Sequence, residues 1–336
     1  MKQISMLDVS SYLPGNPVPV DYYARFAECS DQAGSAMFKA PPHHRHHLAP
    51  GETAVDMAER ALTGLVSRHG RETIRAVDVI VTHTMLPDTP IHGCGGELAH
   101  RVGANPEWIV DLHNAGCVSF VYMLKLARQL LQADGARSAL VCGVANMAGQ
   151  IYVQPQVRKT PQAPIPGDGA GVALLTTSAE SPILHVETLH HNEVAGHMRF
   201  ESGDGRKYWQ PGRGEPRYRF GSDTIEEALH NGNRFVPEVV RRACRRIGVD
   251  TEEIDVLVTN QPNRTFLRNW REALGLPTKR HPDTFDQCGN VFSVGVPVTL
   301  DRAIREETVV SGSLLMLAGF AHTGEVAAAA AVRWRP

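Results

Sequence analysis

The stretch Asp111-Leu112-His113-Asn114-Ala115-Gly116-Cys117-Val118 decides the fold of this chain. Residues 108–112 form a short apolar run typical of a strand, and residues 118–132 follow with helical periodicity. Cys117 therefore stands between the end of a strand and the start of a long helix. Because backbone N–H groups and the helix dipole stabilise a thiolate there, we expect a lowered pKa and a nucleophile near neutral pH. A buried, inert cysteine is the alternative.

The same alternation of apolar runs and amphipathic stretches extends along the whole chain and predicts the α/β class. In the first half we expect strands at 77–82, 138–144 and 171–176 and a helix at 54–68. The order then repeats, with strands at 183–189, 256–260, 314–318 and 326–334 and helices at 224–246, 264–274 and 291–306. We therefore expect two duplicated halves, 1–179 and 180–336, with 196–221 as a long excursion over the surface.

Composition excludes several classes of protein. With 21% charged residues and a net charge of -2, bulk attraction to nucleic acid or to an anionic membrane is not expected. The 6 cysteines are widely spaced without a CxxC pair, which favours a reducing cytoplasm over a disulfide framework or zinc site. We find neither a signal peptide nor an apolar stretch of about 18 residues. The histidines at 43–47 are interpreted as a polar loop, not a metal site.

Several separated segments match one family in the right order. They are Ser11-Tyr12-Leu13-Pro14, Arg45-His46, Ala115-Gly116-Cys117, Gly167-Asp168-Gly169-Ala170-Gly171 and Gln287-Cys288-Gly289-Asn290. Over nearly its whole length the chain resembles β-ketoacyl-acyl-carrier-protein synthase III, of the thiolase superfamily. The resemblance implies a thiolase fold, with two pseudo-equivalent βαβαβαββ halves in a five-layer α-β-α-β-α arrangement. It also implies a homodimer. The enzyme class implied is an acyltransferase that transfers groups other than amino-acyl groups, and it needs no cofactor beyond its thioester substrate.

The resemblance also assigns the site. Cys117 corresponds to the nucleophile and Asn290 to an asparagine that donates to an oxyanion. The family's histidine falls on Asn260, whose amide can still donate a hydrogen bond but cannot act as a base near neutral pH. His322, in the family's glycine-rich turn beside the cysteine, is the best candidate to compensate. The residues expected to contact substrate are His92, Asn263 and Gly319.

The function expected from these residues is transfer of an acyl group from a thioester to Cys117 and then to a second substrate. Two reactions with the second substrate remain open: decarboxylative condensation with a malonyl thioester, and formation of an ester or amide. Either would belong to lipid or secondary-metabolite synthesis, including that of fatty acids and polyketides. The tryptophan and the arginine that grip coenzyme A in some members fall near Ala36 and Ala40, and neither is present here, which favours an acyl carrier protein as donor. The alternative is a non-catalytic accessory subunit of a heteromeric ketosynthase.

One further feature bears on the partner. Four arginines lie mostly on one side of the helix expected at 224–246, namely Arg241, Arg242, Arg245 and Arg246. A solvated helix face explains them most simply, and docking of an acidic carrier protein is the second interpretation.

Overall fold

The computed structural model describes residues 2–28, 31–89, 91–113, 115–133, 135–207, 210, 212, 214–219 and 221–335. Cys29, one of the six cysteines, and Asn114, in the stretch quoted first, lie outside these ranges. In the described part no helix is both long and apolar enough to cross a bilayer.

The first sheet is mixed and has five strands in the order β1-β7-β6-β4-β5. Their bounds are β1 Ser5–Tyr12, β7 Gly169–Thr176, β6 Ser138–Ala145, β4 Val79–Thr84 and β5 Trp108–Asp111. Strands β6, β4 and β5 run parallel, whereas β1 and β6 both pair antiparallel with β7. Because the parallel strands end at one edge of the sheet, the residues that follow β4 and β5 meet there.

The second sheet has four strands in the order β11-β12-β13-β8. Their bounds are β11 Val256–Thr259, β12 Leu314–Ala321, β13 Val326–Arg333 and β8 Ile183–His190. Pairing of β8, β13, β12 and β11 repeats that of β1, β7, β6 and β4. Nothing between residues 260 and 295 forms a strand equivalent to β5, so the repeat is incomplete at this edge.

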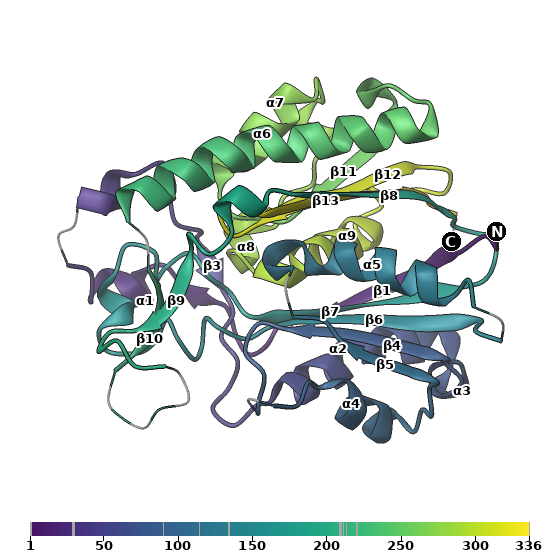
Figure 1. Ribbon diagram of the computed structural model, residues 1–336, viewed down its shortest axis with the longest axis horizontal. Coiled ribbons are helices and arrows are strands. Elements are labelled where there is room, and N and C mark those ends of the chain that lie inside the picture. Colours follow the sequence, from purple (N-terminus) through teal and green to yellow (C-terminus); the bar gives the residue numbers. More distant parts are fainter. Residues whose placement is uncertain are drawn as a thin grey trace.

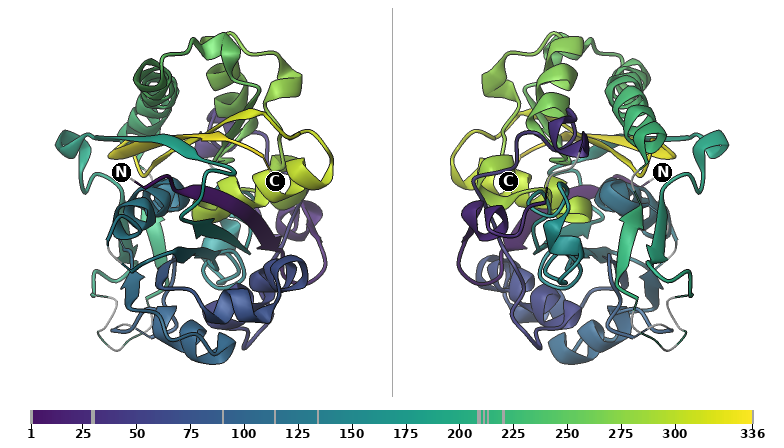
Figure 2. Two further views of the ribbon diagram at one scale, coloured as in Figure 1. Left: turned by 90° about the vertical axis from the view of Figure 1, so that its right-hand side faces the viewer. Right: turned by 90° about the vertical axis from the view of Figure 1, so that its left-hand side faces the viewer.

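Helices complete five layers (Figures 1 and 2). One outer layer holds α2 Ala54–His69, α3 Arg71–Arg75 and α4 Gly95–Val102, and the other holds α6 Ser222–Ile247 and α7 Arg264–Ala273. Between the sheets lie α5 Ser119–Leu130 and α9 Gly295–Arg305, whose apolar side chains join strands of both sheets in one core. The α-β-α-β-α arrangement is confirmed.

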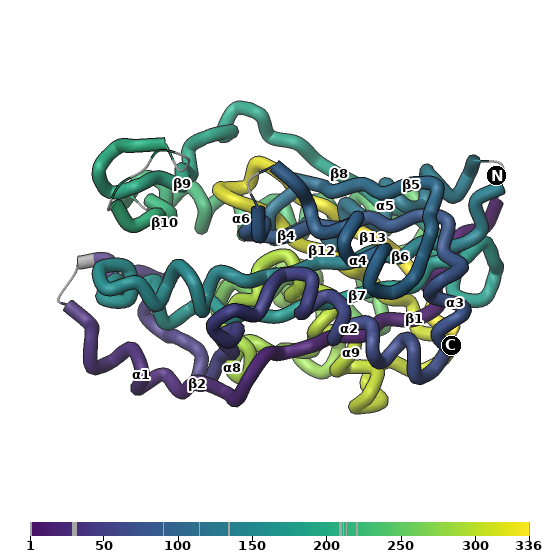
Figure 3. The backbone as a smooth tube through the Cα atoms, turned by 90° about the horizontal axis from the view of Figure 1, so that it is seen from below, coloured from purple at the N-terminus to yellow at the C-terminus, as the bar shows by residue number. Residues whose placement is uncertain are grey.

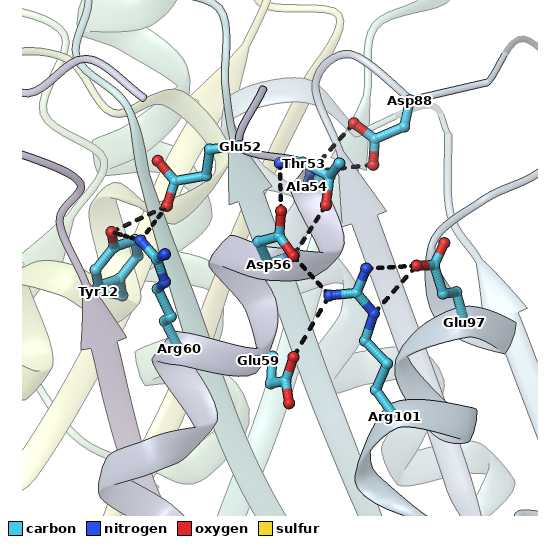
Figure 4. Close-up of polar contacts among 10 residues, drawn as sticks. All are labelled: Tyr12, Glu52, Thr53, Ala54, Asp56, Glu59, Arg60, Asp88, Glu97 and Arg101. Carbon is cyan, nitrogen blue, oxygen red and sulfur yellow. Dashed lines mark hydrogen bonds and ion pairs between the residues drawn. The ribbon is translucent and has the colours of Figure 1, made fainter. Parts of the chain in front are cut away.

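The start of α2 shows how local chemistry fixes an outer helix (Figure 4). The Thr53 hydroxyl accepts from the Asp56 N–H at 3.1 Å, and the Asp56 carboxylate accepts from the Thr53 N–H at 2.8 Å. Such a capping box satisfies two N–H groups that the first turn leaves unpaired. Arg101 of α4 donates to Asp56 at 2.6 Å and to Glu97 at 2.6 Å, which ties the two helices together.

Small elements gather at the end of the molecule away from the two termini (Figures 1 and 3). They are β2 Val18–Pro19, α1 Asp21–Ala24, β3 His44–Arg45, β9 Arg199–Ser202, β10 Pro216–Arg219 and α8 Phe285–Cys288. The expected surface excursion at 196–221 therefore contains a β-hairpin. Of the histidines expected in a polar loop, His43 and His44 are exposed, whereas His46 is buried and its Nδ1 donates to the Pro14 carbonyl at 2.9 Å.

Candidate active site

Cys117 lies in a single 3-10 turn, η2 Gly116–Val118, between β5 and the start of α5. This turn replaces the first residues of the helix expected from residue 118. The Cys117 side chain is half-buried and lines a pocket of about 100 Å³. The same pocket is lined by Asn260, Asn290 and His322, which come from three separate segments of the second half. The structure thus brings the four residues expected to act in catalysis to one place.

The protonation of Cys117 differs from the expectation. Burial raises the pKa of the thiol to about 12, and a backbone hydrogen bond lowers it only in part. No lysine or arginine lies among the described residues that line the pocket, so no cation offsets the loss of water. The prediction of a lowered pKa is wrong in direction, and the thiol needs a base to become a nucleophile.

Asn290 is held rigidly in the turn that follows α8. Its N–H donates to the Ile165 carbonyl at 2.9 Å, and its carbonyl accepts from the Gly167 N–H at 3.0 Å. The side-chain oxygen accepts from the Phe292 N–H at 3.0 Å. Because this bond occupies Oδ1, the amide NH₂ is the group left to donate into the pocket. Gly289, with φ of 70°, permits this turn, since a Cβ there would lie 2.6 Å from the Ile165 carbonyl oxygen.

Asn260 follows the last residue of β11 and is 1% exposed. Its Nδ2 donates to the Phe320 carbonyl at a long 3.4 Å, and its Oδ1 is buried without a partner in the described part of the chain. Gly319 of β12 packs directly on this amide, because a Cβ at Gly319 would lie 2.6 Å from Oδ1. Gly319, expected to contact substrate, therefore lies behind Asn260.

His322 follows β12 in a left-handed backbone conformation, with φ of 57°. Its ring lies against the turn of Cys117, since a Cβ at Gly116 would be 3.0 Å from Cε1 and 3.1 Å from Nε2. Burial lowers the pKa of His322, and Glu325 opposes that shift. Its imidazole is therefore neutral at pH 7 and able to accept a proton.

His92 and Asn263, the two other residues expected to contact substrate, lie outside this pocket. His92 is exposed and lines surface hollows beside α4 and β5. Asn263 caps α7, where its side-chain oxygen accepts from the Phe266 N–H at 2.9 Å. Its sequence position before a helix would have indicated this cap.

A second chamber of about 490 Å³ adjoins the first at Gly116 and His322. His83, the fifth residue of β4, lines it together with the exposed His113. Sequence reasoning placed His113 near the nucleophile but did not consider His83. Its position at the carboxyl end of a parallel strand beside β5 was the signal available, because such ends form the ligand edge of the sheet.

The arrangement of sheets and site defines the class of protein. A 3-oxoacyl-(acyl carrier protein) synthase III from Pseudomonas aeruginosa superposes with a TM-score of 0.85 at 24% identity, covering 100% of this chain and 99% of that chain. The priming β-ketosynthase of the R1128 polyketide pathway gives 0.84 at 22% identity, covering 100% and 97%. These likenesses show the thiolase fold.

Sequence relatives go further than the fold. The family model of 3-oxoacyl-[acyl-carrier-protein] synthase III matches residues 111–191, and the model of its C-terminal part matches residues 244–334. The β-ketoacyl-[acyl-carrier-protein] synthase III of Thermosynechococcus vestitus is 30% identical over 293 residues, 87% of each chain. That of Gloeobacter violaceus is 28% identical over 278 residues, 82% of each. The chain belongs to the 3-oxoacyl-[acyl-carrier-protein] synthase III family of acyl-transferring enzymes, whose substrate thioester is used without a further cofactor.

Proposed function

We propose that this protein transfers an acyl group through a thioester on Cys117. The observation that carries the proposal is the pocket that joins Cys117 to Asn260, Asn290 and His322. The Cys117 sulfur attacks the carbonyl of a donor thioester, the new C–S bond forms, and the bond to the donor sulfur breaks. The thiol proton ends on the departing thiolate.

His322 carries that proton between the two sulfurs. Its neutral ring lies against Gly116, next to the nucleophile, and the raised pKa of Cys117 requires a base for attack. Asn290 donates its NH₂ to the oxyanion that develops on the thioester carbonyl, and one such donor is worth roughly a hundredfold in rate or more. Asn260 completes this polar end of the pocket, with an amide where the family has a histidine.

The second substrate is either a malonyl thioester, which loses carbon dioxide and forms a C–C bond, or an alcohol or amine, which forms an ester or amide. A neutral His322 supports the protic acceptor, because it can take the proton that an alcohol or amine loses as its bond to the acyl carbon forms. The experiment is a chase. Acylated protein is mixed with a malonyl thioester, an alcohol or an amine, and loss of the adduct is followed by intact mass.

We propose an acyl carrier protein as the donor, with coenzyme A as the alternative. Arg241, Arg242, Arg245 and Arg246 occupy the last two turns of α6. Arg242 pairs with Glu238 at 2.6 Å, and Arg246 lies 3.9 Å from Glu187. Such a cationic helix end fits an acidic carrier. Arg245 makes no ion pair within the described residues. Arg245→Glu should raise the KM for the carrier-bound donor and leave the KM for a pantetheine thioester unchanged.

We also propose a homodimer of cytoplasmic chains, each built from the halves 1–179 and 180–336. Strand β5 forms an edge of the first sheet, and its residues Trp108 and Ile109 are each 42% exposed. An exposed apolar edge strand invites pairing with another chain. Ile109→Lys should shift the molecular mass measured by light scattering from that of two chains to that of one.

An accessory subunit without catalysis is the second candidate. The observation in its favour is the raised pKa of Cys117 together with an asparagine at the position of the family histidine. A structural subunit, however, has no need for the ordered amide of Asn290 beside a thiol. Failure of every donor thioester to acylate Cys117 would favour this candidate.

A further inference from the structure

The second chamber is the larger of the two spaces beside the Cys117 turn. It reaches about 490 Å³, within the size range of small-molecule pockets, whereas the pocket around Cys117 holds about 100 Å³. The two spaces share Gly116 and His322. Because the thioester carbonyl must lie beside the asparagines, the larger chamber is the space into which an acyl chain on Cys117 can extend.

His83 makes one part of this chamber unusual. Its side chain is 4% exposed, and Nδ1 is buried without a hydrogen-bond partner in the described part of the chain. Buried polar atoms are nearly always paired, and one left unpaired destabilises the fold. Burial, with His113 and His322 nearby, lowers the pKa of His83 to about 3, so the ring is neutral at pH 7. The same ring lines the second chamber, where it presents an uncharged polar group to whatever is bound.

The rest of the wall defines the character of that group. Most of the lining is apolar, with methionine, leucine, isoleucine and proline side chains and the aromatic rings of Phe200 and Tyr218. Thr84, beside His83, adds a hydroxyl. The described lining residues include no lysine, arginine, aspartate or glutamate, so the wall offers no permanently charged partner to a charged group. An uncharged hydroxyl fits best, because it can both donate to and accept from an imidazole.

We propose that the second chamber holds the acyl group on Cys117 and that His83 selects an uncharged, hydroxyl-bearing acyl group, either aromatic or of medium chain length. This inference rests on the proposed function, since it names the substrate class of the same site. His83 acts here as a specificity residue that touches the acyl group, away from the bonds that form and break.

The test compares matched thioesters in single-turnover acylation. Pantetheine thioesters of benzoate and its three monohydroxy forms, and of octanoate and 3-hydroxyoctanoate, are mixed with the protein, and the rate constant for the Cys117 adduct is read from intact mass. The expected result is that at least one hydroxylated member reacts about tenfold faster than its plain partner, because a buried polar group left unpaired penalises the plain chain.

Two variants assign that preference to His83. His83→Leu should abolish it while the plain members still react, and His83→Asn should keep part of it, because the amide places a polar atom near the position of Nδ1. His100→Leu, which changes an exposed histidine of α4, is the matched control and should keep the full preference. If His83→Leu does not fold, the wild-type ratios and His83→Asn decide.

The outcomes separate the two proposals. The role of His83 is overturned if all hydroxylated and plain members acylate Cys117 at equal rates, or if the preference persists in His83→Leu. Either result leaves the proposed acyl transfer intact. No acylation by any member overturns the proposed function, and the role of His83 falls with it.

Discussion

Gly319→Ala tests whether acylation of Cys117 depends on the position of the Asn260 side-chain amide. The new Cβ would lie 2.6 Å from Oδ1 of Asn260 and 3.1 Å from its Cγ. Contacts below 3.0 Å force a shift, so the amide of Asn260, which is 1% exposed and lines the pocket, would be pushed out of its place. Overpacking of this kind costs about 1–3 kcal/mol. Displacement of the amide should also slow acylation of Cys117, by about a hundredfold if it acts as an oxyanion donor.

The assays are urea unfolding at one fixed protein concentration and single-turnover acylation followed by intact mass. Gly96→Ala is the matched control, since nothing lies within 4 Å of a Cβ at this position of α4. It should stabilise the fold by about 0.5–1 kcal/mol and keep the acylation rate. Adding Asn260→Ala to Gly319→Ala should recover stability without recovering the rate. Wild-type stability together with a wild-type rate in Gly319→Ala would refute this account of Asn260.

Three further changes probe the site and its support. Alkylation of Cys117 by iodoacetamide should accelerate about tenfold per pH unit from pH 7 to 10, because the thiol pKa is raised to about 12, and a plateau below pH 8 would contradict this. Gly116→Ala should abolish acylation in a folded protein, because the new Cβ would lie 3.0 Å from the ring of His322 and Gly116 has a φ of 42° that alanine rarely adopts. An unchanged yield of acyl adduct by intact mass would count against that contact. Asp56→Ala should lower the free energy of unfolding by about 1 kcal/mol through loss of the α2 cap. Arg101 lowers the pKa of Asp56 to about 2 from 3.8, so this difference should be present at pH 7 and shrink as the pH falls through 4 toward 2 in urea titrations.

Most strands of the two sheets could be predicted because they are short apolar runs that the core buries on one or both faces. Residues 138–144 and 171–176, for example, fall within β6 and β7. Strand β1 was not predicted, since Ser5–Tyr12 mixes polar and apolar residues and gains its strand conformation from pairing with β7. The incomplete second repeat was also missed, because no local pattern distinguishes a loop at 281–284 from an edge strand.

The four residues of the site could be predicted because each lies in a segment that resembles one family, and the fold brings those segments together. Gly167 shows why the glycines of its segment were informative: a Cβ there would lie 2.0 Å from the Cys288 carbonyl oxygen, so only glycine lets this segment pack against the turn before Asn290. The pKa of Cys117 could not be predicted in the same way. It depends on the water excluded by side chains from distant segments, and burial outweighs the start of α5.

The substrate-contact residues were the least predictable part. His92 stands in a segment that aligns with a pocket wall, but its side chain faces outward at the surface. His83 looked like an ordinary strand residue, and only the tertiary structure places it in the wall of the second chamber. A side chain's direction at the end of a strand depends on tertiary contacts that a single sequence does not contain.

The most direct test of the central claim is the intact mass of wild-type protein and of Cys117→Ala after incubation with a panel of acyl-coenzyme A and acyl-carrier-protein thioesters. The account predicts a single acyl adduct on the wild type that is absent from Cys117→Ala and maps to the peptide that carries Cys117. An adduct of equal yield on Cys117→Ala, or no adduct with any donor, would contradict acyl transfer through this cysteine.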